Sequence, residues 1–501
     1  NYLRNMEERK DDIKRIIEEQ GKLTEELSAQ IDNAQKLSEL EDIYRPFRPK
    51  RRTRATVAKE KGLEPLSNIL YLQNLANGDI DEIAAPFIDK EKGVNNTEEA
   101  LAGAMDIIAE AVSDNAEHRK KIRELTEKNG LLVSKAVTEE DSVYRLYYDF
   151  AEPVAKAVPH RVLAIDRGEK EKLLSVSVDV DEEKILSYLK KREITNRASI
   201  TATYVEAAVE DAYKRLIQPA IEREIRNELT DNAQEQAMKV FKVNLRNLLM
   251  QAPIRGQVVI GLDPGYKNGC KVGVVDETGK VLDMGVIYIT HSKAQEEKAK
   301  EFIKGLIKKY HVTLISIGNG TASKETEIFA ANLIREIPEK VKYIIANEAG
   351  ASVYSASKLA AEEFPDLDVM QRSAISIARR VQDPLAELVK IEPKAIGVGQ
   401  YQHDMNQKRL SETLGGVVED CVNSVGVDLN TASAPLLKYV SGISSAIANN
   451  IVAYREEEGR FESRTQLKKV AKLGPKAFEQ CAGFLRISGG KNVLDSTSVH
   501  P

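Results

Sequence analysis

Residues 258–289, VVIGLDPGYKNGCKVGVVDETGKVLDMGVIYI, contain three short apolar runs that are separated by turn residues. The runs cover 258–262, 271–275 and 281–289, and Asp276-Glu277-Thr278-Gly279 lies between the second and the third. Short runs rich in valine and isoleucine, bounded by glycine, proline and aspartate, are typical of β-strands. This stretch therefore predicts three consecutive strands, of which the last two form a hairpin.

The sequence after residue 289 alternates between helical and strand patterns. Helices are expected at about 293–310, 323–336 and 371–391, and strands at 312–317 and 342–346. With the first three strands these elements describe an α/β domain with a mixed sheet. Residues 1–250 read as mostly helical, apart from an irregular connector or small insertion at 144–165, and the chain is helical again from about 407. The predicted fold is therefore multidomain and mostly α, with one central α/β domain.

Length and composition bound the function. The chain has 501 residues, of which 42% are hydrophobic and 30% charged, as expected for several globular domains. No stretch approaches the roughly 20 apolar residues that span a bilayer, so we expect no membrane partner. Cys270, Cys421 and Cys481 lie far apart, which argues against a zinc site or a disulfide framework and favours the cytoplasm. Because the net charge is −5, a nucleic-acid-binding protein of this composition must concentrate its positive charge locally.

Three acidic residues stand where an α/β sheet holds its ligands. Asp263 ends the first strand, Glu348 ends the strand in YIIANE, and Asp383 lies on the later helix in RRVQDPLAEL. Carboxylates at the ends of adjacent parallel strands can converge on one edge of the sheet. Such oxygens suit Mg²⁺ or Mn²⁺, and paired metals can stabilise both oxygens of a phosphodiester displacement. Each acid taken alone is equally compatible with a turn or a solvated surface.

These motifs resemble the YqgF/RuvC group, which has a ribonuclease-H-like fold. The resemblance covers GLDPGYKNGCKVGVVDETGKVLD (261–283), NEAGASVYSAS (347–357) and RRVQDPLAEL. It implies that Asp263, Glu348 and Asp383 hold metal ions in active relatives. The chain departs from the group at Asn347-Glu348-Ala349, where YqgF enzymes show Asp-Glu-Arg. It also has Gly318-Asn319-Gly320 where RuvC resolvases carry a glutamate, and both departures favour a fold kept without its chemistry.

Two similar pentapeptides near the C-terminus point to phosphate binding. Val440-Ser441-Gly442-Ile443-Ser444 and Val470-Ala471-Lys472-Leu473-Gly474 resemble the turns of tandem helix-hairpin-helix units, with Ser444 and Lys472 in place of the usual glycines. A glycine turn lets the backbone approach a phosphate, and the N–H groups that open the next helix point at it. We expect Gly442, Ser444, Lys472, Gly474 and Lys476 to contact the nucleic-acid backbone without reading bases.

A basic run lies near the N-terminus, in RPFRPKRRTRATVAKEK (45–61). Its candidate phosphate-binding residues are Lys50, Arg51, Arg52 and Arg54, although such runs are often solvated faces. The surrounding stretch LEDIYRPFRPKRRTRATVAKEKGLEPL is similar to a signature of the Tex family of transcription accessory proteins. With the two other motifs in the same order, the resemblance spans residues from about 20 to 500.

The resemblance implies a domain organisation. We expect a helical region at 1–250 with a helix-turn-helix-like element, a YqgF/RuvC-like domain at 255–395 and a helical connector at 396–428. A tandem helix-hairpin-helix domain at 429–490 and a linker at 491–501 complete the expected order. Because Tex proteins continue into an OB-type RNA-binding domain, we expect this chain to stop before it and to lack an N-terminal piece.

The resemblance also implies a function and leaves one alternative open. We expect a scaffold that binds DNA or RNA near the transcription machinery, with no cofactor needed. The alternative is a Mg²⁺-dependent or Mn²⁺-dependent endonuclease that uses Asp263, Glu348 and Asp383. The departures in the acidic motifs favour the scaffold over the enzyme.

Overall fold

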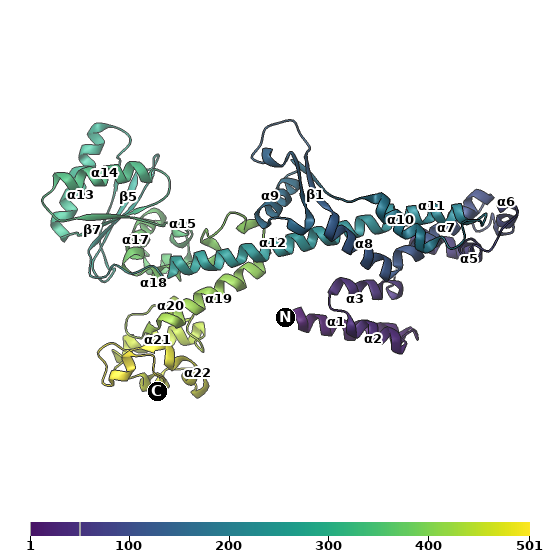
Figure 1. Ribbon diagram of the computed structural model, residues 1–501. Helices are drawn as coiled ribbons and strands as arrows, with labels where there is room; N and C mark the ends of the chain where they lie inside the picture. The colour runs from purple at the N-terminus through teal and green to yellow at the C-terminus, as the bar shows by residue number, and fades with distance from the viewer. Residues whose placement is uncertain (1, 50–51) are drawn as a thin grey trace. The chain divides into compact units, whose positions relative to one another are not determined.

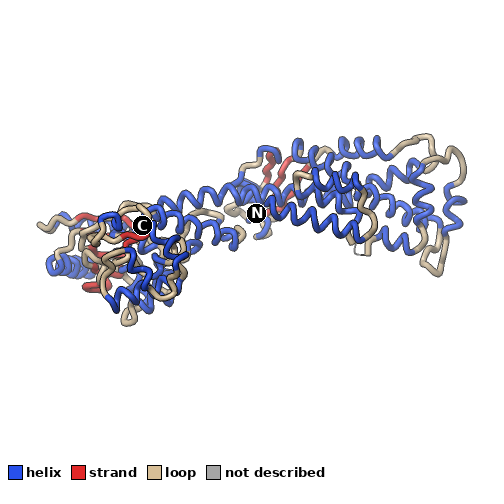
Figure 2. The backbone as a smooth tube through the Cα atoms, turned by 90° about the horizontal axis from the view of Figure 1, so that it is seen from below, coloured by secondary structure: helices blue, strands red, loops and turns tan. Residues whose placement is uncertain are grey.

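A computed structural model describes residues 2–49 and 52–501 of the chain. The chain divides into two compact units, Asn1–Glu235 and Gln236–Pro501, which are described separately. Most of the chain is helical (Figure 2), and the prediction of a mostly α, multidomain chain with one central α/β domain is confirmed. None of the helices in the described ranges combines the length and apolarity needed to cross a bilayer.

The first unit is built from amphipathic helices. The first three, α1 (Tyr2–Glu19), α2 (Glu25–Asn33) and α3 (Leu37–Tyr44), bury the isoleucines and leucines that recur at helical spacing, including Ile13, Ile17, Ile31 and Leu40. The helices that follow are α4 (Arg54–Glu60), α5 (Glu64–Leu72), α6 (Ile80–Ala84), α7 (Thr97–Asp114), α8 (Ala116–Asn129), α9 (Pro159–Lys170), α10 (Glu182–Glu193), α11 (Ala202–Asp211) and α12 (Gln218–Leu249). The helix-turn-helix-like element expected in this region stays a prediction.

A three-stranded antiparallel sheet interrupts these helices. It consists of β1 (Leu131–Ala136), β2 (Asp149–Pro153) and β3 (Leu174–Asp179), in the order β2-β1-β3. The stretch 144–165, expected to be an irregular connector or a small insertion, is not irregular, because it contains β2 and the start of α9. Strands of five or six residues give a weak pattern by themselves, and these are stabilised by pairing between segments far apart in sequence.

Buried ion pairs join the helices of the first unit. On α8, Arg119 and Arg123 both contact Asp42 of α3, at 2.8 Å and 2.6 Å, and both also contact Glu224 of α12. The Arg119 side chain is fully buried and that of Asp42 nearly so. A charge buried this deeply is tolerated only when it is paired, so this cluster fixes how the three helices pack.

The second unit begins with the last part of α12, which is followed by a five-stranded mixed sheet. Its strands are β4 (Val259–Asp263), β5 (Cys270–Val275), β6 (Val281–Ile287), β7 (Leu314–Gly318) and β8 (Lys342–Ala346), in the order β6-β5-β4-β7-β8. The first three strands are antiparallel neighbours, whereas β7 is parallel to both β4 and β8. The carboxyl ends of β4, β7 and β8 consequently lie at the same edge of the sheet.

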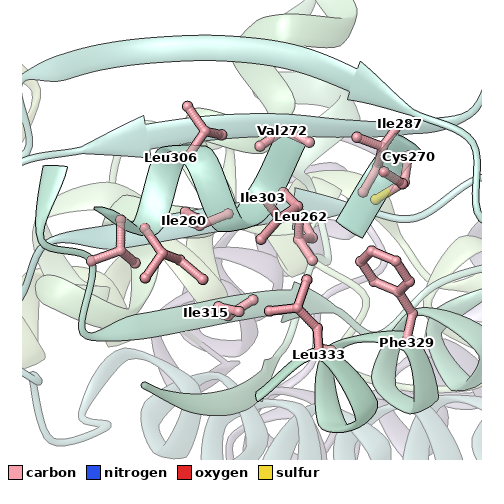
Figure 3. Packing of buried hydrophobic residues seen from close by; sticks show 14 of the residues in the cluster. Ile260, Leu262, Cys270, Val272, Ile287, Ile303, Leu306, Ile315, Phe329 and Leu333 are labelled. Atoms are coloured by element: carbon pink, nitrogen blue, oxygen red, sulfur yellow. The ribbon is translucent and has the colours of Figure 1, made fainter. Parts of the chain in front are cut away.

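Helices cover both faces of this sheet. Ile260, Leu262 and Val272 pack with α13 (Lys293–Tyr310) and α14 (Ser323–Glu336) on one face, through Ile303, Leu333 and their neighbours (Figure 3). Alternate strand residues turn to the other face, against α17 (Val369–Gln382). The helix can approach this closely because residue 261 is a glycine: a β-carbon there would lie 2.1 Å from the Ala374 carbonyl oxygen.

The remaining elements of the second unit are short, apart from two helices. After α15 (Ala351–Ser355), α16 (Lys358–Glu363), α17 and α18 (Pro384–Leu388) come the long α19 (Gln407–Val425), α20 (Ala434–Leu437), α21 (Ser445–Glu458) and α22 (Pro475–Cys481). Two strands of two residues each, β9 (Val427–Asp428) and β10 (Leu485–Arg486), pair in parallel and close the C-terminal module. Figure 1 labels the main elements of this unit.

Candidate functional site

Two of the three predicted acids meet at the carboxyl edge of the α/β sheet. Asp263 ends β4, and Glu348 lies two residues beyond β8. The Glu348 carboxylate lies over the end of β7, where a β-carbon at Gly318 would be 2.2 Å from Oε2 and one at Gly320 would be 1.7 Å from Oε1. The two glycines therefore make the room that this carboxylate occupies. Asn319, between them, accepts a hydrogen bond from the Glu348 backbone N–H at 3.0 Å.

The environment of this pair disfavours its negative charge. Burial raises the pKa of Glu348, and the neighbouring charge of Asp263 raises it further. Burial also raises the pKa of Asp263, although a hydrogen bond from the Ser373 hydroxyl and the charge of Lys271 oppose the shift. Among the described residues, Glu348 Oε2 is buried and has no hydrogen-bond partner. Such a carboxylate is costly to bury, so this edge stores unfavourable electrostatic energy.

Two cations balance the pair from within the protein. Lys271 is the direct neighbour of Asp263 across the β4–β5 ladder and is almost fully buried. Arg380 of α17, which is 3% exposed, donates to the carbonyl oxygens of Asn347 and Ala349 at 2.6 Å and 2.9 Å. Arg380 thus holds the backbone on either side of Glu348.

The structure does not bring Asp383 to this cluster. Gln382, the preceding residue, donates to the carbonyl oxygens of Gln257 and Asp276, which lie at the opposite end of β4 from Asp263. Asp383 is exposed and caps α18, accepting from the Ala386 N–H at 3.0 Å. The expected single helix at 371–391 breaks at this point because Pro384 cannot continue α17. The helix residue that reaches Asp263 is Ser373.

This donor set limits the metal chemistry of the site. A single Mg²⁺ that keeps most of its water ligands can be held by one or two carboxylates, which Asp263 and Glu348 supply. A pair of metal ions needs further acidic ligands, and the described ranges contain no group of three or more His, Cys, Asp or Glu side chains arranged to hold a metal. The buried ammonium group of Lys271 also competes with a cation for Asp263. The residues present therefore do not fit a two-metal centre.

The two predicted hairpins have matching structures. Gly442 and Lys472 both have a positive φ, of 79° and 66°, and the next residue of each turn, Ile443 or Leu473, is buried. The residues after these, Ser444 and Gly474, are the N-caps of α21 and α22. The Ser444 hydroxyl accepts from the Ile447 N–H at 3.3 Å. Each turn therefore exposes its tip and the start of the following helix in the same way.

The two hairpin glycines have different surroundings. A β-carbon at Gly442 would be 2.7 Å from the Gln480 β-carbon and 3.2 Å from the Ala477 carbonyl oxygen, so this glycine packs against α22. At Gly474, which has an ordinary φ of −77°, no described atom lies within 4 Å of an added β-carbon. Lys476, the second residue of α22, is exposed beside it.

The stretch 491–501, expected to be a linker, begins with residues that belong to the hairpin module. Arg464 is 1% exposed, and its guanidinium group contacts Asp495 at 2.8 Å and donates to the carbonyl oxygens of Ala482 and Leu494. Asp495 is also buried, and the Arg464 charge and hydrogen bonds hold its pKa below the usual range. This pair fastens the end of the chain to the hairpins.

The basic run is partly neutralised by nearby acids. Lys50 and Arg51 lie outside the described residues. Arg52 lies 3.5 Å from Glu60, and both side chains are exposed. Arg54 is the exposed first residue of α4. Since exposed ion pairs are weak, a phosphate could still compete for these arginines.

Comparison with known proteins agrees with this architecture. Family models match as "Tex central region-like" over residues 76–241, "Tex protein YqgF-like domain" over 257–382 and "Helix-hairpin-helix motif" over 422–486. The "Uncharacterized protein YdcI" of Bacillus subtilis is 52% identical over 505 residues, covering all of this chain and 70% of that protein. The chain belongs to the Tex family.

Other relatives carry more informative names. The "Transcriptional accessory protein Tex" of Neisseria gonorrhoeae is 46% identical over the whole chain, which spans 66% of it. The human "S1 RNA-binding domain-containing protein 1" is 38% identical over 94% of this chain, and the aligned region is 49% of the human protein. The chain thus corresponds to about two thirds of the bacterial Tex relatives and to half of the human one.

Three residues that contact or balance the Asp263–Glu348 pair of this Tex protein were not predicted. Lys271 gave a signal, since a lysine inside the apolar run CKVGVV requires a buried partner. Ser373 and Arg380 gave none, because their role depends on which face and which end of α17 meets the sheet. The third acid was expected at Asp383, which the structure places at the N-cap of α18.

Proposed function

We propose that this chain grips the sugar–phosphate backbone of nucleic acid through its two hairpins, as the binding core of a transcription accessory protein. The observation that carries the proposal is the repeated conformation of residues 440–444 and 470–474, each ending in an exposed helix start. Two phosphate-binding turns in one module match a ligand whose charges repeat along a chain.

The first hairpin offers backbone donors. The N–H groups in the first turn of α21 have no carbonyl partner within the helix, and the Ser444 side chain takes only one of them, that of Ile447. Ser444, Ser445 and Ala446 are exposed. A phosphate placed there meets N–H groups and the positive end of a 14-residue helix, which together make an anion site.

The second hairpin offers charged side chains. Lys468, Lys469, Lys472 and Lys476 fall within nine residues that contain no acid. Across 430–490 there are nine Lys and Arg residues against five Glu, or +4 by difference, in a chain of net charge −5. The positive charge is thus concentrated where the hairpins are, as a backbone-binding surface requires.

The acidic cluster supports a binding role rather than cleavage. Asp383 caps a helix at the other end of the sheet, and Lys271 lies beside Asp263. Without a third acid, the paired metals of the endonuclease alternative lack ligands. If Asp263 and Glu348 hold a single Mg²⁺, the metal would supply charge neutralisation for a nearby phosphate. We propose DNA or RNA as the ligand and the transcription machinery as the setting, in keeping with the names of the relatives.

A binding experiment can separate this proposal from a purely structural role of the hairpins. Aspartate is a favourable N-cap residue, so Ser444→Asp and Gly474→Asp keep or strengthen the starts of α21 and α22 while they place a negative charge at each tip. Binding of fluorescein-labelled duplex DNA and RNA is measured by anisotropy at several salt concentrations. Ser444→Thr and Gly474→Ala serve as uncharged controls.

We expect each aspartate variant to bind roughly tenfold or more weakly, because a hydrogen-bonded phosphate contact contributes about 1.5–3 kcal/mol. On duplex DNA the salt slope should fall by roughly 0.9 for each phosphate that the variant no longer neutralises. Unchanged affinity in both aspartate variants would remove the hairpins from the interface. Mg²⁺ or Mn²⁺ added to the same samples tests cleavage, and cleavage that Asp263→Asn abolishes would restore the endonuclease alternative.

A further inference from the structure

The loop between β1 and β2, residues 137–148, exposes large apolar side chains. Val143 is 88% exposed and Leu146 84%, and Val137 at the base of the loop is 60% exposed. In Figure 1 this loop projects beyond the end of β1. Single exposed leucines are common on protein surfaces, but aliphatic side chains this exposed and this close in sequence are unfavourable in water unless something covers them.

The loop is held in one conformation by its own contacts. The Tyr148 hydroxyl donates to the Glu140 carbonyl oxygen and is also hydrogen-bonded to the Ser142 hydroxyl at 2.8 Å. Ser134 Oγ, on β1, donates to the Tyr147 carbonyl oxygen at 2.8 Å. Tyr144 is buried, with its ring beside Gly168 of α9. Val143 and Leu146 therefore project from an ordered backbone, so a partner would have little loop entropy to remove on binding.

The charges around these side chains select the kind of partner. Glu139, Glu140, Asp141 and Asp149 surround them in sequence, against the single cation Arg145, which gives −3 over residues 137–149. Arg145 is itself 3.4 Å from Asp141. A loop segment of this charge disfavours phosphates, so a nucleic acid or an anionic membrane is a poor match for it.

We propose that the β1–β2 loop is a protein-docking element, which inserts Val143 and Leu146 into an apolar cleft whose edges carry lysine and arginine. The acidic residues then face the basic edges, which steers association and fixes its orientation. The apolar side chains supply the affinity, as buried anchors do in the centres of protein interfaces. This element belongs to the first unit and the hairpins to the second, and the two segments carry opposite charges.

The first experiment identifies what contacts the loop. In one variant of the full chain, the photoreactive residue p-benzoylphenylalanine replaces Val143. In a matched control it replaces Val243 of α12, an exposed valine with the basic neighbours Lys242 and Arg246. Both proteins are irradiated in bacterial cell extract, with and without nuclease treatment. We expect one protein adduct at position 143 that resists nuclease and is absent at position 243. Attachment to nucleic acid, to a second copy of this chain, or equally at both positions would overturn the proposal.

The second experiment measures the energetics with the purified adduct protein as the probe. Leu146→Ser should weaken its binding roughly tenfold or more, because it removes an aliphatic anchor. The double charge reversal Glu139→Lys with Glu140→Lys should weaken binding at low salt and much less at high salt. Since these side chains are exposed, thermal unfolding and nucleic-acid binding should match wild type in all variants. Unchanged affinity in both variants would refute the docking element, while leaving the proposed function of the hairpins untouched.

Discussion

Alanine substitutions at the two hairpin glycines should have very different effects on stability. Gly442 has a φ of 79° and lies against α22, whereas Gly474 has an ordinary φ and open space around it. The left-handed conformation costs a residue with a β-carbon about 1–2 kcal/mol. Forcing that carbon to within 2.7 Å of the Gln480 β-carbon adds about 1–3 kcal/mol of overpacking, because α22 itself must move. Gly442→Ala should therefore destabilise the hairpin module by about 2–5 kcal/mol.

Gly474→Ala should change stability by less than about 0.5 kcal/mol. Alanine reduces the entropy of the unfolded chain, which stabilises the fold, but it is a poorer N-cap than glycine, and the two effects nearly cancel. Lys472 occupies the position equivalent to Gly442 and already has a φ of 66°. Lys472→Gly should accordingly stabilise the module by about 1 kcal/mol while it removes a positive charge.

Hydrogen exchange followed by mass spectrometry is the suitable assay, because it reports local opening in the intact chain. Peptides from α21 and α22 should lose protection in Gly442→Ala and keep it in Gly474→Ala, while peptides from β4 and β5 serve as an internal control. Equal protection of α21 and α22 in both variants would refute the assigned packing of Gly442. A loss of protection in Gly474→Ala as large as in Gly442→Ala would show that the second turn is equally crowded.

Two further predictions concern buried charges. Asp495→Asn should destabilise the hairpin module by about 3–5 kcal/mol, since it leaves Arg464 buried without its anion. Because the pKa of Asp495 is lowered in the folded state, the stabilisation by its charge is present at neutral pH and should be lost as the pH falls through that pKa. Acid unfolding of the wild type and of the variant measures this loss. Glu348→Gln should raise the thermal unfolding temperature at neutral pH, since burial and Asp263 disfavour the charged form of Glu348. Because the pKa of Glu348 is raised in the folded state, the wild type itself gains stability as the pH falls through that pKa, and the advantage of the variant should shrink. Asp383→Asn, which changes an exposed N-cap residue, should show neither effect.

Local patterns in the sequence were sufficient for much of this fold. The strands β4 to β8 and the helices α13 and α14 were predicted within a few residues, because apolar runs and helical periodicity report directly on burial. The two hairpins were predicted from their resemblance to helix-hairpin-helix turns, and both pentapeptides have apolar residues at the first and fourth positions. The placement of Asp263 and Glu348 at one edge followed from parallel strands ending together.

Tertiary structure alone decided how distant segments meet. The sheet β2-β1-β3 depends on pairings between strands of only five or six residues. Helix α17 meets β4 with its N-terminal half at the acidic edge, so Ser373 lies beside Asp263 and Asp383 does not. The same holds for the exposure of Val143 and Leu146, which look like ordinary core residues in sequence. Hydrophobic spacing specifies which residues are buried within one element. The register and direction in which two elements pack depend on the side chains of both elements, so the pattern of one segment does not determine them.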